Sequence, residues 1–109
     1  MKTGDIVLVR FHPSAGAELK RFRPAVIVSG KINAIDSRFT LIAPLTTGLR
    51  PINASYELHI KNNAALQKDS LLLCWYLRTV DIGRLERKLG SLNNRDIKKV
   101  KTILQKLLG

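Results

Sequence analysis

A segment between two apolar stretches, residues 11–24, gathers side chains that could act on a phosphate. It is longer than the roughly two to five residues that close a hairpin, and its polar members are His12, Glu18, Lys20, Arg21 and Arg23. A long loop that combines a proton carrier with fixed cations is typical of binding or catalytic segments. A solvated basic loop without chemistry is the alternative. Arg23 differs from the others because Pro24, which follows it, favours an extended backbone.

Thr46 and Thr47 form a second candidate group, because they follow an apolar stretch and precede Gly48. Hydroxyls and backbone amides at the end of a strand can hold phosphate oxygens. Threonine and glycine are also ordinary turn residues. This group alone is therefore weak evidence for a phosphate site.

Short strands are predicted to position these residues. β-Branched and apolar residues run between turn signals, at residues 5–11, 24–29, 38–45, 56–60 and 70–77. The run 24–29 is short and apolar enough for a strand buried on both faces. Pro44 restricts the end of its strand to an edge or a bulge. Three leucines at 71–73 leave a helix possible for the last run.

The C-terminal stretch has a helical period instead. Its apolar residues recur at spacings of three, four and seven, at Ile97, Val100, Ile103, Leu104, Leu107 and Leu108. Asn93 is a suitable N-cap, with Asp96 at the third helical position and Leu92 placed to pack on Ile97. A shorter helical turn is expected at 83–89. The predicted fold class is α+β and mainly β: one domain over 1–109, with a small antiparallel, barrel-like sheet closed by helices.

The charge of the chain predicts a polyanionic partner. There are 19 Lys and Arg against 8 Asp and Glu, which gives a formal charge of +11 and a pI near 10.4. Nucleic acid, an anionic membrane surface or an acidic protein would suit this charge. Residues 84–109 hold eight basic and two acidic residues. A solvated helix face is the alternative explanation of that terminal zone.

Composition also excludes several classes of protein. One cysteine excludes a disulfide framework and a cysteine-built zinc site, and it indicates a reducing compartment. No apolar run is long enough for a spanning helix, and the N-terminus lacks the layout of a signal peptide. The expected location is the cytoplasm, without a membrane partner.

Taken together, these segments resemble successive blocks of the MazF/PemK toxin ribonucleases. The blocks are residues 4–7 (GDIV), Pro13 with residues 16–18 (GAE), residues 23–29 (RPAVIVS) and residues 44–46 (PLT). Residues 77–81 (LRTVD), 84–85 (RL) and 89–90 (LG), followed by the terminal helix, continue the match. The resemblance covers residues 4–107, and the ordered set is specific although no single block is.

The resemblance implies an SH3-like β-barrel that works as a homodimer. It implies cleavage of single-stranded RNA at short sequences without metal or cofactor, and inhibition by an acidic antitoxin protein. By motif position it makes Arg23 and Thr46 catalytic and Glu18 supportive. RNA-binding or supporting roles are expected for His12, Lys20, Arg21, Thr47, Tyr76 and Arg78. A guanidinium and a hydroxyl suit this chemistry, because charge builds on the phosphate oxygens when the ribose 2′-hydroxyl attacks.

One departure from the family concerns the proton acceptor. Many members carry an acidic residue and a glutamine just before the Arg-Thr pair, where this chain has Trp75 and Tyr76. His12 and His59 are the candidates to move the proton, so the general base is not determined. Trp75 is expected to be a core or dimer residue, with base stacking as the alternative. Cys74 is expected to be a small buried hydrophobe.

Two other functions are consistent with these observations. A barrel could bind nucleic acid through its charge without cleaving it, since the acidic position is absent. A protein with the toxin fold could instead act on a protein target such as a topoisomerase.

Overall fold

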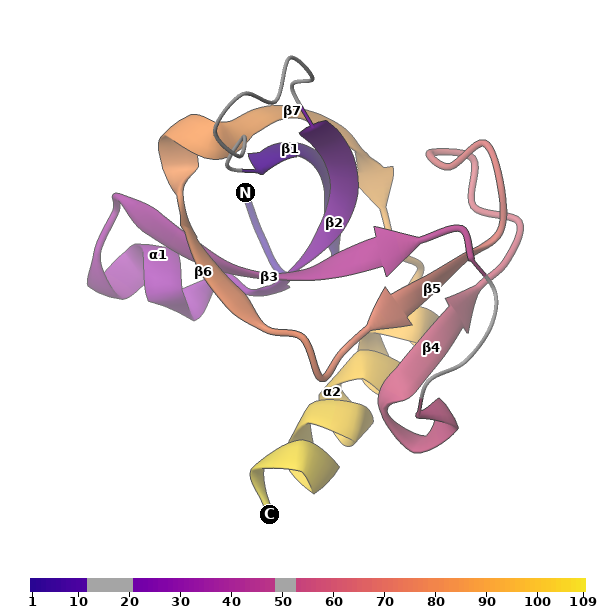
Figure 1. Ribbon diagram of the computed structural model, residues 1–109. Helices are drawn as coiled ribbons and strands as arrows, with labels where there is room; N and C mark the ends of the chain where they lie inside the picture. Colours follow the sequence, from indigo (N-terminus) through magenta and orange to yellow (C-terminus); the bar gives the residue numbers. More distant parts are fainter. Residues whose placement is uncertain (12–20, 49–52) are drawn as a thin grey trace.

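Seven strands and two α-helices make up the part of the chain that the computed structural model describes, residues 1–11, 21–48 and 53–109 (Figure 1). The strands are β1 (Asp5–Phe11), β2 (Arg21–Ser29), β3 (Phe39–Thr46), β4 (Glu57–Ile60), β5 (Ser70–Leu73), β6 (Arg78–Asp81) and β7 (Leu85–Ser91). The helices are α1 (Lys31–Ile35) and α2 (Asn94–Leu108), with 3₁₀ turns η1 (Ala54–Tyr56) and η2 (Ile82–Arg84). The predicted class, mainly β with a C-terminal helix, is confirmed.

All strand pairs are antiparallel, in the order β4-β5-β3-β2-β1-β7, and β6 also pairs with β3. The chain passes from β6 to β7 through η2. The strands β1, β2, β3, β6 and β7 therefore form the ring seen in Figure 1, and η2 makes its corner without a β6–β7 ladder among the described residues. The result is a small barrel from which β4 and β5 extend.

Two hydrophobic cores lie on opposite faces of β2. Ala25 and Ile27 belong to the core inside the barrel, and Val26 and Val28 belong to the core on the other face. All four side chains are buried, which confirms the prediction of a strand buried on both faces. Because successive side chains of a strand point to opposite faces, an uninterrupted apolar run can serve both cores.

Helix α2 covers the second core. Val100 and Ile103 of the helix join the cluster that contains Leu58 and Leu72 of β4 and β5. The predicted N-cap is confirmed, because Asn93 Oδ1 accepts a hydrogen bond of 2.8 Å from the backbone N–H of Asp96. Lysines 98, 99, 101 and 106 of α2 are exposed. No helix among the described residues is long and apolar enough to cross a bilayer.

Several local predictions were wrong. The helical turn expected at 83–89 is η2 followed by β7, because Leu85–Ser91 pairs with β1. The predicted strand 70–77 is β5 and ends at Leu73, so its helical alternative is excluded. Helix α1 and strand β6 were not expected, and β2 begins three residues before the predicted start at residue 24.

Pro44 lies inside β3 rather than at the edge of the sheet. It is paired with Ala25 of β2, but on β3 the ladder with β6 ends at Ile42 and the ladder with β5 begins at Leu45. Proline has no N–H to donate. Pro44 thus lies neither on an edge strand nor at a bulge of the β2–β3 ladder, but at a gap between two short ladders on the other side of β3.

Candidate functional site

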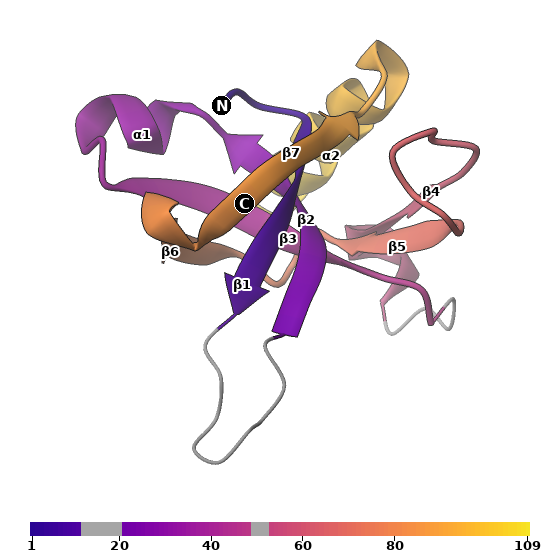
Figure 2. The same ribbon diagram turned by 90° about the horizontal axis from the view of Figure 1, so that it is seen from above.

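Arg23 and Thr46 lie where β2 and β3 separate. The last paired residues of the two strands are Ala25 and Pro44, and Arg23 and Thr46 each follow two positions further toward the separated ends. Because side chains alternate along a strand, these two residues share the face of Ala25 and Pro44. Figure 2 shows β2 turning away from β3 in this region. The ends of β2 and β3 thus carry a cation and a hydroxyl on the two sides of the point where the strands separate.

Arg23 lies within a strand and not in a loop. It is paired with Val9 of β1, and its side chain is exposed. Val9 is completely buried, so the backbone below the guanidinium is held by the barrel core. The guanidinium is therefore presented to solvent from a fixed position.

Thr46 ends β3 and begins a tight turn. Its Oγ1 accepts a hydrogen bond of 3.3 Å from the backbone N–H of Gly48. A hydroxyl has one proton to donate and two lone pairs, so this bond leaves the proton of Thr46 for another acceptor. Thr47, the next residue, is exposed.

Thr46 shares its neighbour Leu71 of β5 with His59. Thr46 is opposite Leu71 in the β3–β5 ladder, and His59 is opposite Leu71 in the β4–β5 ladder. Strands lie about 4.8 Å apart, so Thr46 and His59 are separated by roughly 10 Å of sheet. Leu71 is buried, while His59 is exposed.

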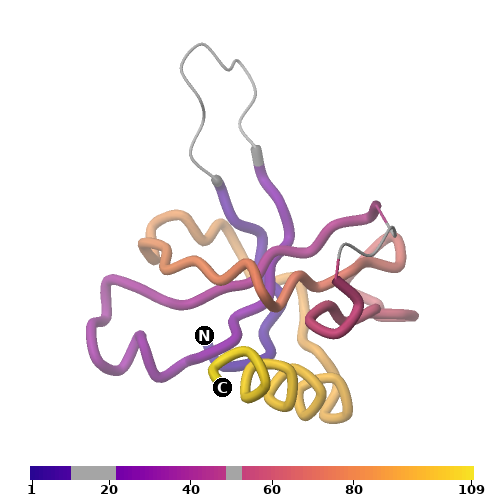
Figure 3. Tube along the Cα trace, turned by 60° about the horizontal axis from the view of Figure 1, so that its bottom comes forward, coloured from indigo at the N-terminus to yellow at the C-terminus, as the bar shows by residue number. Residues whose placement is uncertain are grey.

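This row of residues lies on the face of the sheet opposite α2. Leu58 and Ile60 flank His59 along β4 and pack in the core beneath α2. By alternation, His59 and its opposite residues Leu71 and Thr46 face the other way. Figure 3 shows the paired ends of β1 and β2 on the side of the molecule away from α2.

Trp75 and Tyr76 follow β5 and reach the same region. Trp75 Nε1 donates a hydrogen bond of 2.7 Å to Glu57 Oε2 of β4. Glu57 has the same strand parity as His59, so its side chain lies on the face opposite α2. The expectation that Trp75 is a core residue was wrong, since 38% of its surface is exposed. Whether a second copy covers it stays a prediction.

Comparison with known proteins defines the family. Residues 2–108 match the family described as "PemK-like, MazF-like toxin of type II toxin-antitoxin system". The chain is also 30% identical over 110 residues to the endoribonuclease MazF of Staphylococcus saprophyticus, covering 100% of this chain and 92% of that protein. The MazF of Staphylococcus epidermidis matches with the same identity and coverage. The chain belongs to the MazF/PemK toxin family.

Solved structures of MazF proteins share the fold of this MazF-like toxin. A MazE–MazF structure from Deinococcus radiodurans superimposes with a TM-score of 0.80 at 23% identity, covering 100% of this chain and 96% of that one. An endoribonuclease in complex with its cognate antitoxin, from a mycobacterial species, gives a TM-score of 0.79 at 18% identity and covers 100% and 95%. These likenesses support the predicted barrel with its terminal helix.

Sequence reasoning missed Glu57 of this MazF-like toxin. Glu57 is only 7% exposed and lies 18 residues before Trp75, its hydrogen-bond partner. Trp75 thus stands where many family members have an acidic residue, and Glu57 of β4 brings a carboxylate next to it. Only the β4–β5 register could have revealed it, because that register places Glu57 opposite Leu73.

Cys74 of the toxin is a buried thiol, as predicted. It is completely shielded from solvent. Burial, with the nearby negative charge of Glu57, raises the pKa of the thiol to about 11. The thiol therefore stays protonated at neutral pH and is a poor nucleophile.

Of the remaining predicted site residues of the toxin, some lie in strands and others lie outside the described residues. Arg78 begins β6, opposite Ile42 of β3, and is half-buried. Arg21 begins β2, where its backbone is opposite that of Phe11. His12, Glu18 and Lys20 lie outside the described residues. Among the described residues no three His, Cys, Asp or Glu side chains gather as metal ligands would.

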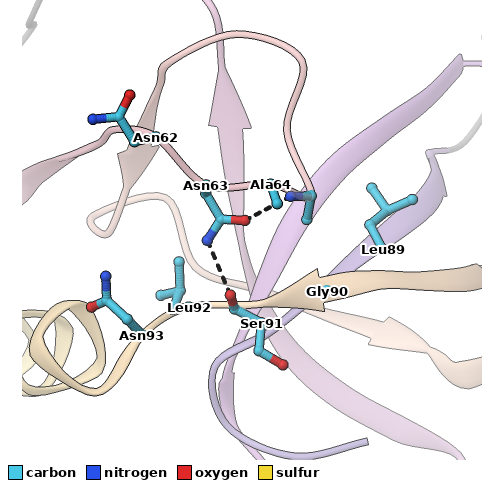
Figure 4. A pocket seen from close by; sticks show the side chains of 9 residues that line it. Asn62, Asn63, Ala64, Leu89, Gly90, Ser91, Leu92 and Asn93 are labelled. Atoms are coloured by element: carbon cyan, nitrogen blue, oxygen red, sulfur yellow. Dashed lines mark hydrogen bonds between the residues drawn. The ribbon is translucent and has the colours of Figure 1, made fainter.

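A separate pocket of the toxin lies between the β4–β5 connection and β7 (Figure 4). The side-chain amide of Asn63 donates 3.0 Å to the carbonyl of Ser91, and its Oδ1 accepts 2.9 Å from the N–H of Ala65. A Cβ on Gly90 would come within 2.6 Å of the Ala65 side chain, so the loop packs directly on β7. These contacts anchor the β4–β5 connection to β7 and account for the pocket. None of the residues that line the pocket is a predicted site residue.

Proposed function

We propose that this toxin endoribonuclease cleaves single-stranded RNA at short sequences, by attack of a ribose 2′-hydroxyl on the adjacent phosphate and without a metal. The observation that carries the proposal is the position of Arg23 and Thr46, on one face at the parting of β2 and β3. The phosphate of the substrate would lie between them. Membership of the MazF/PemK family supports the reaction class.

Arg23 and Thr46 stabilise the charge that develops on the phosphate. As the 2′-oxygen approaches phosphorus, negative charge grows on the non-bridging oxygens. The guanidinium of Arg23 can donate two parallel hydrogen bonds to them, and the free proton of Thr46 can donate a third. Loss of one such donor typically lowers the rate by a factor of roughly 10²–10³.

His59 is the proton acceptor in this proposal. It is exposed, it faces the same side of the sheet as Thr46, and Leu71 alone separates them across the ladders. The imidazole accepts the proton of the 2′-hydroxyl, and the P–O5′ bond breaks as the 2′-oxygen bonds to phosphorus. The departing 5′-oxygen takes up a proton from water, and His59 returns its proton to solvent. The products are a 2′,3′-cyclic phosphate and a free 5′-hydroxyl.

The assembly is part of the proposal. A homodimer formed from residues 1–109 as a single toxin domain would place two such faces along one RNA groove. An acidic antitoxin segment would compete with RNA for the basic surface and fold as it docks. The expected compartment is the cytoplasm.

The test is digestion of a long single-stranded RNA in EDTA, followed by mapping of the ends. We expect cleavage at a short recurring sequence, with cyclic phosphate and 5′-hydroxyl termini. A substrate with one deoxyribose at the cleavage position should bind and resist cleavage there. Cleavage at the substituted position would rule out 2′-hydroxyl attack. Salt-sensitive RNA binding without any cleavage would favour a non-cleaving nucleic-acid-binding barrel.

A further inference from the structure

Two adjacent aromatic side chains are exposed on the connection from β5 to β6. Trp75 and Tyr76 keep 38% and 45% of their surface accessible. Their rings stack with centroids 5.5 Å apart and planes inclined by 20°. Large aromatic side chains are on average more deeply buried than this, so the exposure of the stack requires a structural cause.

The strand register provides that cause. β5 pairs Leu72 with Leu45, and β6 pairs Arg78 with Ile42. Five residues, 73–77, thus stand against only two residues of β3, 43–44. The residues without a partner on β3 form a turn outside the ladder. Hydrogen bonds close this turn, from Cys74 N–H to Leu72 O at 3.1 Å and from Tyr76 N–H to Leu73 O at 3.0 Å. The backbone itself therefore presents the two rings.

Glu57 fixes the orientation of the indole. The single polar group of the indole donates to Glu57 Oε2 at 2.7 Å, and Glu57 is a buried residue. Burial of a carboxylate is unfavourable unless it is hydrogen-bonded. Because the indole N–H is already used inside the protein, the indole offers a ligand its face and its edge.

We propose that the Trp75–Tyr76 stack holds a nucleobase of the RNA substrate; the proposal rests on the endoribonuclease function above. Every base has a π-face, and exposed aromatic rings are the usual platforms for single-stranded nucleic acid. A pair that is already stacked, with one ring hydrogen-bonded to the protein, loses little conformational freedom when a third ring joins it. Glu57 acts as a positioning residue for this platform.

The location of the stack agrees with this ligand. The connection passes Pro44, which lies two residues before Thr46 on β3. Glu57, to which the indole is bonded, lies two residues before His59 on β4 and on the same face. A strand whose phosphate lies at Arg23 and Thr46 would therefore place a neighbouring base beside the stack, and the net charge of +11 favours the approach of its backbone.

The sequence offers a direct spectroscopic probe, because Trp75 is its single tryptophan. The test titrates the full chain with a short single-stranded 2′-O-methyl oligoribonucleotide, which cannot react at the 2′ position. An abasic oligonucleotide with the same number of phosphates is the control. We expect the base-bearing strand to quench the emission of Trp75 and the abasic strand to bind by charge with little quenching. Equal quenching by the two strands would overturn the proposal.

Variants separate the rings from the remaining surface. Tyr76→Leu and Trp75→Leu should each weaken binding of the base-bearing strand about tenfold and leave binding of the abasic strand unchanged. Tyr76→Phe keeps the ring and should bind as the wild type does. Ile35→Ala, at an exposed apolar side chain of α1, is the matched control. Equal affinities of Tyr76→Leu and wild type for the base-bearing strand would contradict the platform.

Glu57 needs a readout beyond affinity, because its replacement can also affect folding. Glu57→Gln keeps an acceptor for the indole and should retain base-dependent quenching. Glu57→Ala should lose that quenching while its circular dichroism stays native. If Glu57→Ala unfolds, the Glu57→Gln result decides the positioning role, and loss of quenching in that folded variant would refute it.

Two further outcomes separate this proposal from others. If the emission of Trp75 changes on dilution without RNA, and Trp75→Leu disrupts a dimer, a second copy occupies the stack and the proposal is wrong. If the wild-type protein cleaves RNA but base-bearing and abasic strands quench Trp75 equally, the platform proposal is wrong and the endoribonuclease function stands. If it shows base-dependent quenching without cleavage of all-ribose RNA, the platform stands and the cleavage mechanism fails.

Discussion

Ala25 of β2 and Pro44 of β3 are the last paired residues before the two strands separate. Pro44 brings no N–H, and the ladder on β3 is interrupted beside it between Ile42 and Leu45. Arg23 and Thr46 follow this point on the two separated ends. The same interruption gives the β5–β6 connection room to leave the sheet with its aromatic pair. Pro44 thus lies beside both parts of the candidate site: the strand ends that carry Arg23 and Thr46, and the connection that carries the aromatic pair.

Replacement of Arg23 should abolish cleavage without unfolding the protein. Arg23→Ala removes the cation, and Arg23→Lys should also lose most activity because an ammonium cannot make the two-pronged contact. The side chain is exposed, so circular dichroism and melting should be unchanged. Arg87→Ala, at an exposed position of β7, is the control for loss of one charge. Cleavage by Arg23→Ala near the wild-type rate would remove Arg23 from the site.

Thr46→Ala should lower the cleavage rate by roughly 10²–10³-fold, because one donor to the phosphate is lost. Thr46→Ser keeps the hydroxyl and should retain much of the activity. Single-turnover rates at saturating RNA are the measurement. Thr102→Ala, which removes an exposed hydroxyl of α2 that donates to Lys98 O, should cleave at the wild-type rate. Full activity of Thr46→Ala would direct attention to Thr47.

His59→Ala should lower cleavage by about 10²–10⁴-fold if His59 takes the proton of the 2′-hydroxyl. RNA binding should change little, which separates the proton role from a binding role. Added imidazole should restore part of the rate of His59→Ala and leave that of Thr46→Ala unchanged. Lys61→Ala, just after β4 and exposed, is the control. Wild-type cleavage by His59→Ala would leave the proton acceptor to be sought elsewhere.

The parts of the fold that depend on local signals could be predicted from the sequence. Helix α2 was predicted with its N-cap because Asn93 and the apolar spacing from Ile97 onward act within a few residues. Strand β7 was mistaken for a helical turn, because residues 83–89 have mixed polarity and only pairing with β1 makes them a strand. Local propensity yields to such tertiary pairing.

The candidate site divides in the same way. Arg23 and Thr46 could be identified because their neighbours, Pro24 and Gly48, mark strand boundaries within the sequence. The approach of Glu57 to Trp75 and the alignment of His59 with Thr46 depend on the registers of two ladders. No pattern in a single strand fixes a register between strands, so these relations required the structure.

Asp5 gives the last prediction, which concerns acid stability. The side chain of Asp5 is 4% exposed. Burial alone would raise its pKa, but the backbone N–H of Lys2, which donates 2.9 Å to Oδ2, and Lys88, whose Nζ lies 3.4 Å from Oδ1, outweigh it and lower the pKa below its ordinary 3.8.

A carboxyl whose pKa is lower in the folded state stabilises that state above its unfolded pKa, and this contribution disappears as the pH falls through the folded pKa. The difference in free energy of unfolding between wild type and Asp5→Asn should therefore be constant from neutral pH to about pH 4 and shrink at lower pH. Chemical denaturation at a series of pH values measures it.

Asp36→Asn is the contrasting variant for this test. Asp36 has a lowered pKa because the Arg38 side chain hydrogen-bonds to it, but the pair is exposed, with an N–O distance of 2.7 Å. Salt screens exposed pairs much more than buried ones. High salt should thus erase the effect of Asp36→Asn and preserve most of the effect of Asp5→Asn. A difference between Asp5→Asn and wild type that stays constant into strong acid would show that Asp5 stabilises the fold through shape and not through its charge.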